Sequence, residues 1–392
     1  MQHGKNFFTR VLTIGLTIFA MLFGAGNLIF PPKLGIEMGQ YTWLGFLGFF
    51  LSAVVLPMIG LLAIVSFEGD YREFFGRLKY PLGDIFIFLC MLIVGPILTM
   101  PRIVMTSYAM MYDFLPFFVT PTLFALGFSA LAFLVTYRPS KLLDIVGKFL
   151  SPLKITSIVI LISAGLFYGI APEPVATDPT TLFWDAFTAG YATLDILGAI
   201  FFGAIIVHLL TKYVSTDERL SIKEAMKITA FAAIFAGFLL GTVYLGMLLL
   251  GAYHGHGLDA LDQGAILRII ALRVLGTMGG FFIAGTVFLA CFTTIVSLSA
   301  VVGEYVYDII DKRLTYAQAV GSVLLVCTFI ASAGLKNILS YSMPFIMFFY
   351  PLIVVIVFCN LAYKLFDFKP ITGPVIIMAV ILIVYKLINI WS

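Results

Sequence analysis

Met21-Leu22-Phe23-Gly24-Ala25-Gly26-Asn27-Leu28-Ile29-Phe30-Pro31-Pro32 lies within an apolar segment that runs from about Phe7 to Pro31. The segment is long enough to cross a bilayer as a helix, but its middle carries two glycines and an asparagine, which weaken helix interiors. Backbone groups without helical partners are tolerated inside a membrane only where they face protein or a wet cavity. Free amides at a positive helix end suit a carboxylate, and free carbonyls suit a small cation or an ammonium. We therefore predict half of a binding site near mid-membrane; the alternative is that the glycines only let a neighbouring helix pack closely.

The composition is typical of a polytopic membrane protein. Of the 392 residues, 61% are hydrophobic and 11% are charged, and the mean hydropathy is +1.09, whereas about a quarter of a soluble domain is charged. The N-terminal apolar stretch is too long for a cleavable signal and is not followed by a small-x-small cleavage pattern. We expect buried free thiols at the four cysteines, which lie in apolar runs without metal-ligand spacing: Cys90, Cys291, Cys327 and Cys359.

About eleven apolar segments follow one another, separated by short polar connections. Their approximate ranges are 8–31, 42–66, 83–111, 117–137, 143–170, 182–211, 227–252, 278–303, 314–335, 342–363 and 373–390. Lys and Arg follow every even-numbered segment, and cytoplasmic loops are the basic ones. We therefore predict a multi-pass protein with a cytoplasmic N-terminus, and eleven spans would place Ser392 outside.

A second interrupted segment lies five spans after the first. Span six carries Thr188-Ala-Gly-Tyr-Ala-Thr-Leu-Asp-Ile-Leu-Gly198, with Gly190, Thr193 and Asp195 near its middle. Interruptions in corresponding spans are typical of an inverted repeat with its site at the repeat interface, and five spans, being an odd number, necessarily give the second set the opposite sense. The predicted fold is an all-α polytopic membrane protein with a five-plus-five inverted-repeat core and discontinuous spans one and six. Its predicted units are 1–170 (spans one to five), 182–364 (spans six to ten) and 365–392 (span eleven, a peripheral helix).

Two further features indicate polar chemistry within the spans. An ionised Asp195 inside the membrane costs at least a few kcal/mol and needs a partner or water, and Arg102 in span three is the expected ionic partner. Asp195 would hold a cation or ammonium, or fix the opened backbone; the alternatives are a structural pair with Arg102 or a protonated acid. In span eight Ala290, Thr293 and Thr294 share one helix face at i, i+3 and i+4. Their oxygens suit Na⁺, although Ser and Thr in membrane helices mostly bond back to their own helix or to a neighbour.

The nine residues Gly24-Ala25-Gly26-Asn27-Leu28-Ile29-Phe30-Pro31-Pro32 resemble the signature of the bacterial branched-chain amino acid:cation symporters, the BrnQ-type carriers. Most of the chain takes part in the resemblance, because four further stretches are similar to landmarks of that family: Gly95-Pro96, Pro101-Arg102, Gly190-Tyr191-Ala192-Thr193-Leu194-Asp195 and Cys291-Phe292-Thr293-Thr294. The resemblance implies Na⁺-coupled uptake of leucine, isoleucine and valine on a leucine-transporter-like fold in the bacterial cell membrane. The family usually has twelve spans, whereas this chain ends after its eleventh.

The resemblance also implies roles for individual positions. Backbone amides at Ala25 and Gly26 would face the substrate carboxylate, carbonyls around 190–193 would take the ammonium, and apolar residues near 96–100 and 196–201 would line the side-chain pocket. The expected substrate-binding residues are Gly24, Ala25, Gly26, Asn27, Gly190, Tyr191, Ala192, Thr193 and Asp195. The expected Na⁺ ligands are Ala20, Phe23, Ala290, Thr293 and Thr294, with Leu22, Asn27 and Thr193 as a second Na⁺ site that the family need not use.

Two other classes of protein fit the sequence poorly. An intramembrane protease would need a paired acid, a Ser/His pair or a His-rich metal cluster within the spans, but Asp195 has no second mid-span aspartate and His208 stands alone. A channel would call for a repeated filter or pore ring, which the sequence does not contain. We expect a transporter and no enzyme, with proton coupling through Asp195 as the alternative to Na⁺. Its expected partners are the amino acid substrate and the lipid bilayer, with no nucleic acid and no obligatory protein partner.

Overall fold

The computed structural model describes residues 7–24, 26–137, 142–212 and 221–391, and leaves out the side chains of 142–152, 212 and 389–391. All regular elements of the described residues are helical. Six apolar helical runs of 32 to 47 residues are long enough to cross a membrane, and five shorter apolar helices accompany them. The predicted all-α, polytopic membrane protein is confirmed.

The helices of the described residues correspond to eleven spans, and spans one and six are each divided into two separate helices. In chain order they are α1 (Phe7–Leu22), α2 (Gly26–Met38), α3 (Thr42–Phe50), α4 (Leu56–Val65), α5 (Tyr71–Gly76), α6 (Leu82–Leu92), α7 (Thr99–Met111), α8 (Pro121–Tyr137), α9 (Leu142–Phe167), α10 (Pro179–Tyr191), α11 (Asp195–Lys212), α12 (Ile222–His254), α13 (Gln263–Ile309), α14 (Tyr316–Ala331), α15 (Leu335–Phe366) and α16 (Thr372–Trp391). Short π-helical turns join α3 to α4 (Leu51–Val55) and α6 towards α7 (Ile93–Ile97). Span one is divided between α1 and α2, and span six between α10 and α11. Both spans are discontinuous, as predicted.

Two helix boundaries differ from the sequence prediction. Span one was expected to end at Pro31, but α2 continues through Pro31 and Pro32 to Met38. A proline lacks an N–H and cannot donate to the carbonyl four residues earlier, so α2 accommodates both prolines at the expense of two helical hydrogen bonds. Span eight was expected to begin near 278, but α13 begins at Gln263 and runs on past Gly276, which interrupts it with φ 67° and ψ −175°.

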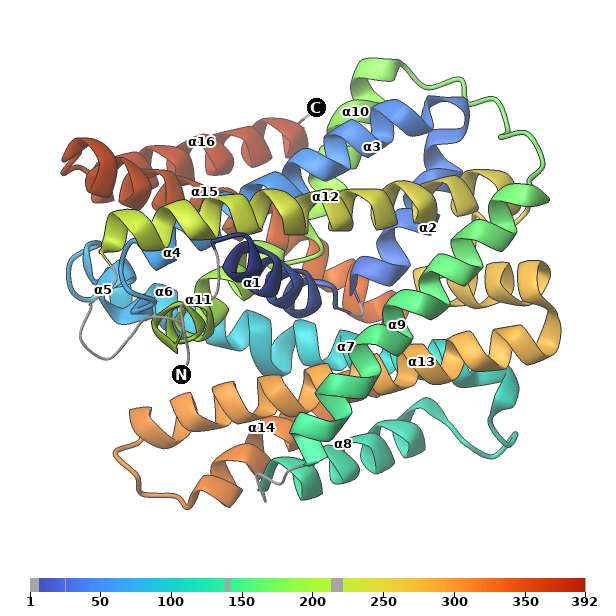
Figure 1. Ribbon diagram of the computed structural model, residues 1–392, viewed down its shortest axis with the longest axis horizontal. Coiled ribbons are helices and arrows are strands. Elements are labelled where there is room, and N and C mark those ends of the chain that lie inside the picture. Colours follow the sequence, from blue (N-terminus) through green and yellow to red (C-terminus); the bar gives the residue numbers. More distant parts are fainter. Residues whose placement is uncertain (1–6, 25, 138–141, 213–220, 392) are drawn as a thin grey trace.

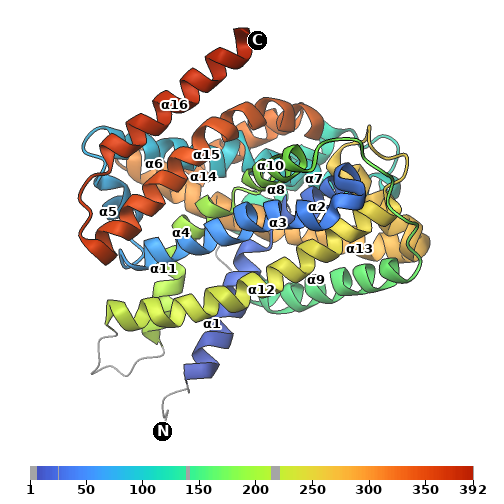
Figure 2. The same ribbon diagram turned by 90° about the horizontal axis from the view of Figure 1, so that it is seen from above.

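The connections that the structure describes lie at two opposite ends of the molecule (Figure 1). The α4–α6 connection, which contains α5, lies at the same end as the α13–α14 and α15–α16 connections. The α7–α8, α9–α10 and α12–α13 connections lie at the opposite end. The first of these ends is called here the N-terminal end, because the start of α1 lies towards it, where α1 projects from the side of the molecule (Figure 2). That this end faces the cytoplasm stays a prediction.

Spans one, two, six and seven pack against one another with almost no space at three glycines. A Cβ atom added to Gly35 of α2 would lie 1.9 Å from the Leu248 carbonyl oxygen of α12, and one added to Gly251 of α12 would lie 1.9 Å from the Pro32 carbonyl oxygen. At Gly190 of α10 the added atom would meet the Ser52 hydroxyl, also at 1.9 Å. These contacts hold α2 and α10, which belong to spans one and six, closely against their neighbours.

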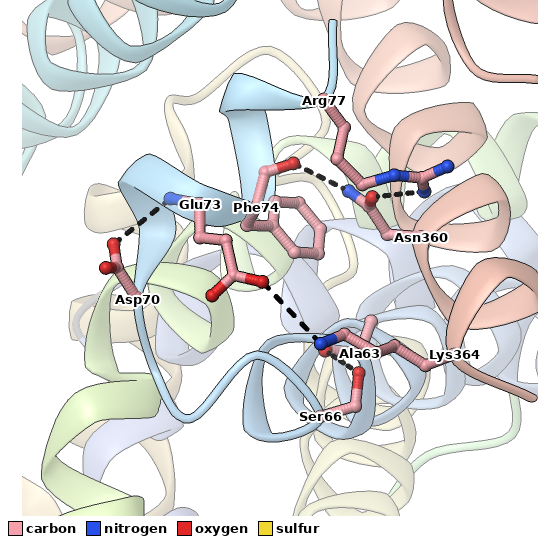
Figure 3. Close-up of polar contacts among 8 residues, drawn as sticks. All are labelled: Ala63, Ser66, Asp70, Glu73, Phe74, Arg77, Asn360 and Lys364. Carbon is pink, nitrogen blue, oxygen red and sulfur yellow. Dashed lines mark hydrogen bonds and ion pairs between the residues drawn. The ribbon is translucent and has the colours of Figure 1, made fainter. Parts of the chain in front are cut away.

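The short helix α5 is fastened to the end of α15 at the N-terminal end (Figure 3). Arg77 donates to the Asn360 side-chain oxygen at 2.8 Å, and the Asn360 amide donates to the Phe74 carbonyl at 3.0 Å. Glu73 and Lys364 form an ion pair at 3.6 Å. The link between spans two and three is thereby tied to span ten.

The last helix, α16, packs on α15 and leaves the body of the molecule at its C-terminal end (Figure 2). Many of its large apolar residues are exposed, including Ile377, Ile381 and Tyr385, as suits a helix that faces lipid. The predicted division into the repeats 1–170 and 182–364, with 365–392 as a peripheral unit, stays a prediction.

Candidate functional site

The first break lies between α1 and α2. The Phe23 amide still donates to Phe19, but the Gly24 amide donates to the Leu22 carbonyl at 2.8 Å. The Ala20 carbonyl therefore loses the donor that a continuous helix would supply four residues later. α2 begins at Gly26, so the break presents carbonyls from the end of α1 and the positive end of α2 to the same space.

The second break lies between α10 and α11. The amides of Thr193 and Leu194 turn back to the Gly190 and Tyr191 carbonyls at 3.2 and 3.1 Å, and Leu194 adopts the left-handed conformation with φ 60°. Such a conformation costs a non-glycine residue about 1–3 kcal/mol and recurs at functional sites. Span six keeps its overall direction through the turn. Asp195 is the first residue of α11, directly after it.

Asn27 connects the two breaks. Its side-chain amide donates to the Leu22 carbonyl at 2.5 Å and to the Asp195 carboxylate at 2.9 Å. Asn27 is 1% exposed and Asp195 is 7% exposed. The carboxylate of span six therefore has an amide of span one as its partner, a contact that the sequence analysis did not predict.

The predicted ion pair between Arg102 and Asp195 is absent, although both side chains are described. Arg102 is 3% exposed and donates through Nη1 to the Ala192 carbonyl at 2.5 Å, while its Nε has no partner. Its Nη2 lies beside Gly26, 3.2 Å from where a Cβ would be. The guanidinium of Arg102 binds the Ala192 carbonyl in the break of span six instead of the Asp195 carboxylate. The Ala192 carbonyl is available because it has no helical N–H donor.

A cavity of about 620 Å³ lies between the breaks. The predicted site residues that line it are Ala20, Leu22, Gly24, Gly26, Asn27, Thr193, Asp195, Ala290, Thr293 and Thr294. Arg102 also lines it, together with apolar side chains from spans three, six and eight, among them Val94, Phe201, Phe202 and Leu298. Of the apolar ranges expected for the pocket, 196–201 contributes Gly198 and Phe201, whereas 96–100 contributes only Thr99.

The cavity extends from the breaks towards the N-terminal end of the molecule. Along that side it is lined by Thr13, Thr17 and Ser297, and by Leu16 and Ile205, which are 49% and 46% exposed. On the opposite side its lining ends at Gly26 and Asn27 of α2, and no α10 residue takes part in it.

On the opposite side Tyr191 and Tyr350 stack with ring centroids 4.3 Å apart, and the Tyr350 hydroxyl donates to the Ser52 carbonyl at 3.1 Å. Tyr350 is 2% exposed. Access to the cavity in this conformation is therefore from the N-terminal end.

The oxygens predicted to bind Na⁺ lie on both sides of the cavity. The hydroxyls of Thr293 and Thr294 both donate to the Ala290 carbonyl, at 3.0 and 2.9 Å, which leaves their oxygen lone pairs free to accept a cation. Ala20 of span one lines the same cavity, and the Phe23 carbonyl accepts a hydrogen bond from Lys154, which also lines it. An all-oxygen set of this kind fits a hard cation, and no group of three His, Cys, Asp or Glu side chains is found in the described part of the chain.

Four predicted site residues do not line the cavity. Phe23 is buried and its carbonyl accepts from Lys154, and Gly190 packs against Ser52 while its carbonyl accepts from the Thr193 amide and hydroxyl. Tyr191 stacks on Tyr350, and the Ala192 carbonyl is held by Arg102. Ala25 lies outside the described residues. The assignment of the 190–193 carbonyls to the substrate ammonium stays a prediction.

Lys154 is a cavity residue that the sequence analysis missed. It projects from α9 of span five, lines the cavity, and donates through its ammonium to the Phe23 carbonyl. An ionisable side chain inside an apolar span is the signal that could have identified it. Lys154 lies near the middle of the predicted span 143–170 and of α9, so the signal was present in the sequence.

Solved structures confirm the architecture. The structure described as the inward-facing conformation of Mhp1 matches with a TM-score of 0.59 and 15% identity, covering 92% of this chain and 79% of that chain. MhsT in complex with L-phenylalanine matches with a TM-score of 0.56 and 18% identity, covering 96% of this chain and 98% of that chain. With its two broken helices around a central cavity, the protein is of the leucine-transporter-like structural class.

Relatives at the level of sequence define the family. A family profile described as branched-chain amino acid transport protein matches residues 8–391. The branched-chain amino acid permease BrnQ of Bacillus subtilis is 31% identical over 367 residues, covering 92% of this chain and 82% of that protein. BrnQ of Escherichia coli is 31% identical over 350 residues, covering 87% and 77%. The chain belongs to this family of transport proteins, as its motifs indicated.

Proposed function

We propose that the protein is a secondary active transporter that takes up leucine, isoleucine and valine together with Na⁺ by alternating access. The observation that carries the proposal is the cavity between two interrupted helices, joined through Asn27 and Asp195. The names of the relatives, branched-chain amino acid permeases, supply the substrate class. We place the protein in the bacterial cell membrane with its N-terminus in the cytoplasm.

The two breaks suit the charged ends of an amino acid zwitterion. The carboxylate would bind at the start of α2, where the Gly26 amide and the helix end are positive, and the Arg102 guanidinium beside Gly26 strengthens that attraction. The ammonium would lie towards Thr193 and Asp195, whose oxygens accept hydrogen bonds. Fixed dipoles thereby replace the water that the zwitterion loses on entering the membrane.

The aliphatic part of the substrate needs only a dry surface. Val94, Phe201, Phe202 and Leu298 supply apolar lining, and a pocket of this kind distinguishes side chains that differ by one methylene by about 1–3 kcal/mol at most. We therefore expect leucine, isoleucine and valine to compete with one another.

The coupling ion would lie between span one and span eight. Ala20, Phe23 and Ala290 offer carbonyls and Thr293 and Thr294 offer hydroxyls, the hard-oxygen chemistry that Na⁺ prefers. Bound there, the cation would stabilise the substrate-competent arrangement of the broken span, so that ion and substrate raise each other's affinity.

The opening of the cavity on one side supports alternating access. The Tyr191–Tyr350 stack closes the opposite side. We propose that a second conformation opens there and closes around α1, with the substrate site between the two gates.

Uptake of radiolabelled leucine into proteoliposomes tests the function. An inward Na⁺ gradient should drive accumulation, and replacing external Na⁺ with choline should abolish it. Uptake driven by a pH gradient alone, and lost in Asp195→Asn, would replace Na⁺ coupling with proton coupling. Absence of leucine uptake under both gradients would contradict the substrate assignment.

A further inference from the structure

The ammonium of Lys154 lies at the carbonyl predicted to bind Na⁺. Lys154 Nζ donates to the Phe23 carbonyl oxygen and lies 4.8 Å from the centre of the Phe23 ring. The side chain comes from α9, which packs on α13, the helix that carries Ala290, Thr293 and Thr294. A cation supplied by the protein itself is therefore in contact with the site proposed for the coupling ion.

The end of α1 attracts positive charge. Phe23 directly follows Leu22, the last residue of α1, and the carbonyls at a helix C-terminus carry partial negative charge. Lys154 forms no ion pair with another described residue. Its charge is stabilised by the carbonyl and by the face of the Phe23 ring, and the same carbonyl would stabilise Na⁺.

Two cations cannot share this carbonyl without a penalty. The ammonium and Na⁺ would be separated by only a few ångströms in a poorly hydrated space, where repulsion between like charges is strong. Binding of either cation at Phe23 must therefore weaken binding of the other. The ammonium occupies the carbonyl while the cavity is open towards the N-terminal end, the side from which the ion would leave during uptake.

We propose that Lys154 is a built-in competitor of Na⁺: in this open conformation its ammonium takes the Phe23 carbonyl, lowers the Na⁺ affinity and promotes release of the ion. The inference rests on the proposed Na⁺ site. It makes Lys154, which reaches from span five to the broken end of span one, a determinant of ion affinity.

Binding of ²²Na⁺ to the purified full-length protein tests the inference directly. Wild type, Lys154→Met and Lys154→Arg are compared in a scintillation proximity assay, with Lys223→Met, at an exposed position of α12, as the matched control. The half-saturating Na⁺ concentration should fall at least tenfold in Lys154→Met, and should stay near the wild-type value in Lys154→Arg and in the control. If Lys154→Met is not monodisperse on size exclusion, Lys154→Gln serves as the uncharged variant, with the same expected direction.

The outcomes separate this inference from the proposed function. If ²²Na⁺ binding is detected in Lys154→Met but not in wild type, this result also supports competition between Lys154 and Na⁺. An unchanged or higher half-saturating concentration overturns it, since a supporting role would weaken binding, and so does absence of Na⁺ binding in every variant. Leucine uptake by wild type that is indifferent to Na⁺ refutes Na⁺ coupling, whereas tighter binding in Lys154→Met would still establish the competition.

Discussion

Arg102 carries a positive charge into the interior of the protein without an acidic partner among the described residues. A charged side chain inside a membrane span costs a few kcal/mol unless it has a partner or faces water. The Arg102 guanidinium contacts both breaks: it donates to Ala192 on span six and lies beside Gly26 on span one. Its Nε has no partner. The guanidinium is therefore available to an anionic group entering the cavity.

Arg102→Gln should reduce leucine affinity by at least tenfold, because the substrate carboxylate loses a charged partner. The informative readout is the preference for leucine over leucinol, which has no carboxylate. Wild type should discriminate strongly against leucinol in competition with radiolabelled leucine, and the variant should discriminate much less. A variant with weaker leucine binding and undiminished discrimination would show that Arg102 only holds Ala192 in place.

Replacing Thr293 and Thr294 together by alanine should raise the Na⁺ concentration needed for half-maximal uptake by about tenfold or more. The loss of stability should be small, because each hydroxyl bonds only to Ala290 on its own helix, and such a bond contributes about 1 kcal/mol net. Thr242→Ala is the control, since Thr242 makes the same type of bond on the exposed face of α12. A double variant with the wild-type Na⁺ response would remove the metal assignment.

At the scale of the elements, glycines determine how closely spans one and seven approach. At Gly35 and Gly251 the neighbouring atoms are backbone carbonyl oxygens, which cannot rotate away as a side chain could. The distance between the α2 and α12 axes is therefore set by backbone contacts and not by side chains that could adjust.

Gly35→Ala should destabilise the protein by about 1–3 kcal/mol or more, the usual effect of overpacking, because the added methyl group forces α2 away from α12. Gly127→Ala is the matched control: Gly127 is an exposed helical glycine with no atom within 4 Å of an added Cβ, so its replacement should be neutral or stabilise by up to about 1 kcal/mol. The check is the melting temperature of each variant, followed by fluorescence-detected size exclusion. Equal melting temperatures for the two variants would show that the helices separate without cost.

The helical breaks could be predicted from sequence because their causes are local. Gly24, Gly26 and Asn27 weaken span one, and Asp195 marks span six as needing a polar partner. Partner choice depends instead on how helices rotate about their axes, which hydropathy does not determine. The sequence therefore predicts two buried charges, Arg102 and Asp195, but not that Arg102 binds Ala192 instead. For the same reason it does not show that Lys154 reaches the cavity.

At the scale of the whole molecule, the cavity is open at one end and sealed at the other. The polar side chains of Thr13, Thr17 and Ser297 line the open side, and the stacked tyrosines seal the other. If the even-numbered connections are cytoplasmic, as their basic residues indicate, the conformation is open to the cytoplasm.

Ser297→Cys should react with a charged, membrane-impermeant maleimide in inside-out vesicles and should be protected in right-side-out vesicles. The background should be low, because the four native cysteines are at most 7% exposed. Thr177→Cys, in the exposed α9–α10 connection at the opposite end, should show the reverse pattern. Labelling of Ser297→Cys only from the outside would invert the predicted topology.

The double hydrogen bond of Asn27 has a thermodynamic consequence. One side-chain amide binds both the Leu22 carbonyl at the end of α1 and the Asp195 carboxylate. A ligand that binds at one break therefore changes the binding free energy of a ligand at the other break. Linkage then requires symmetry: the factor by which saturating Na⁺ tightens leucine equals the factor by which saturating leucine tightens Na⁺. Shortening that side chain, as in Asn27→Ala, should bring both factors towards unity together.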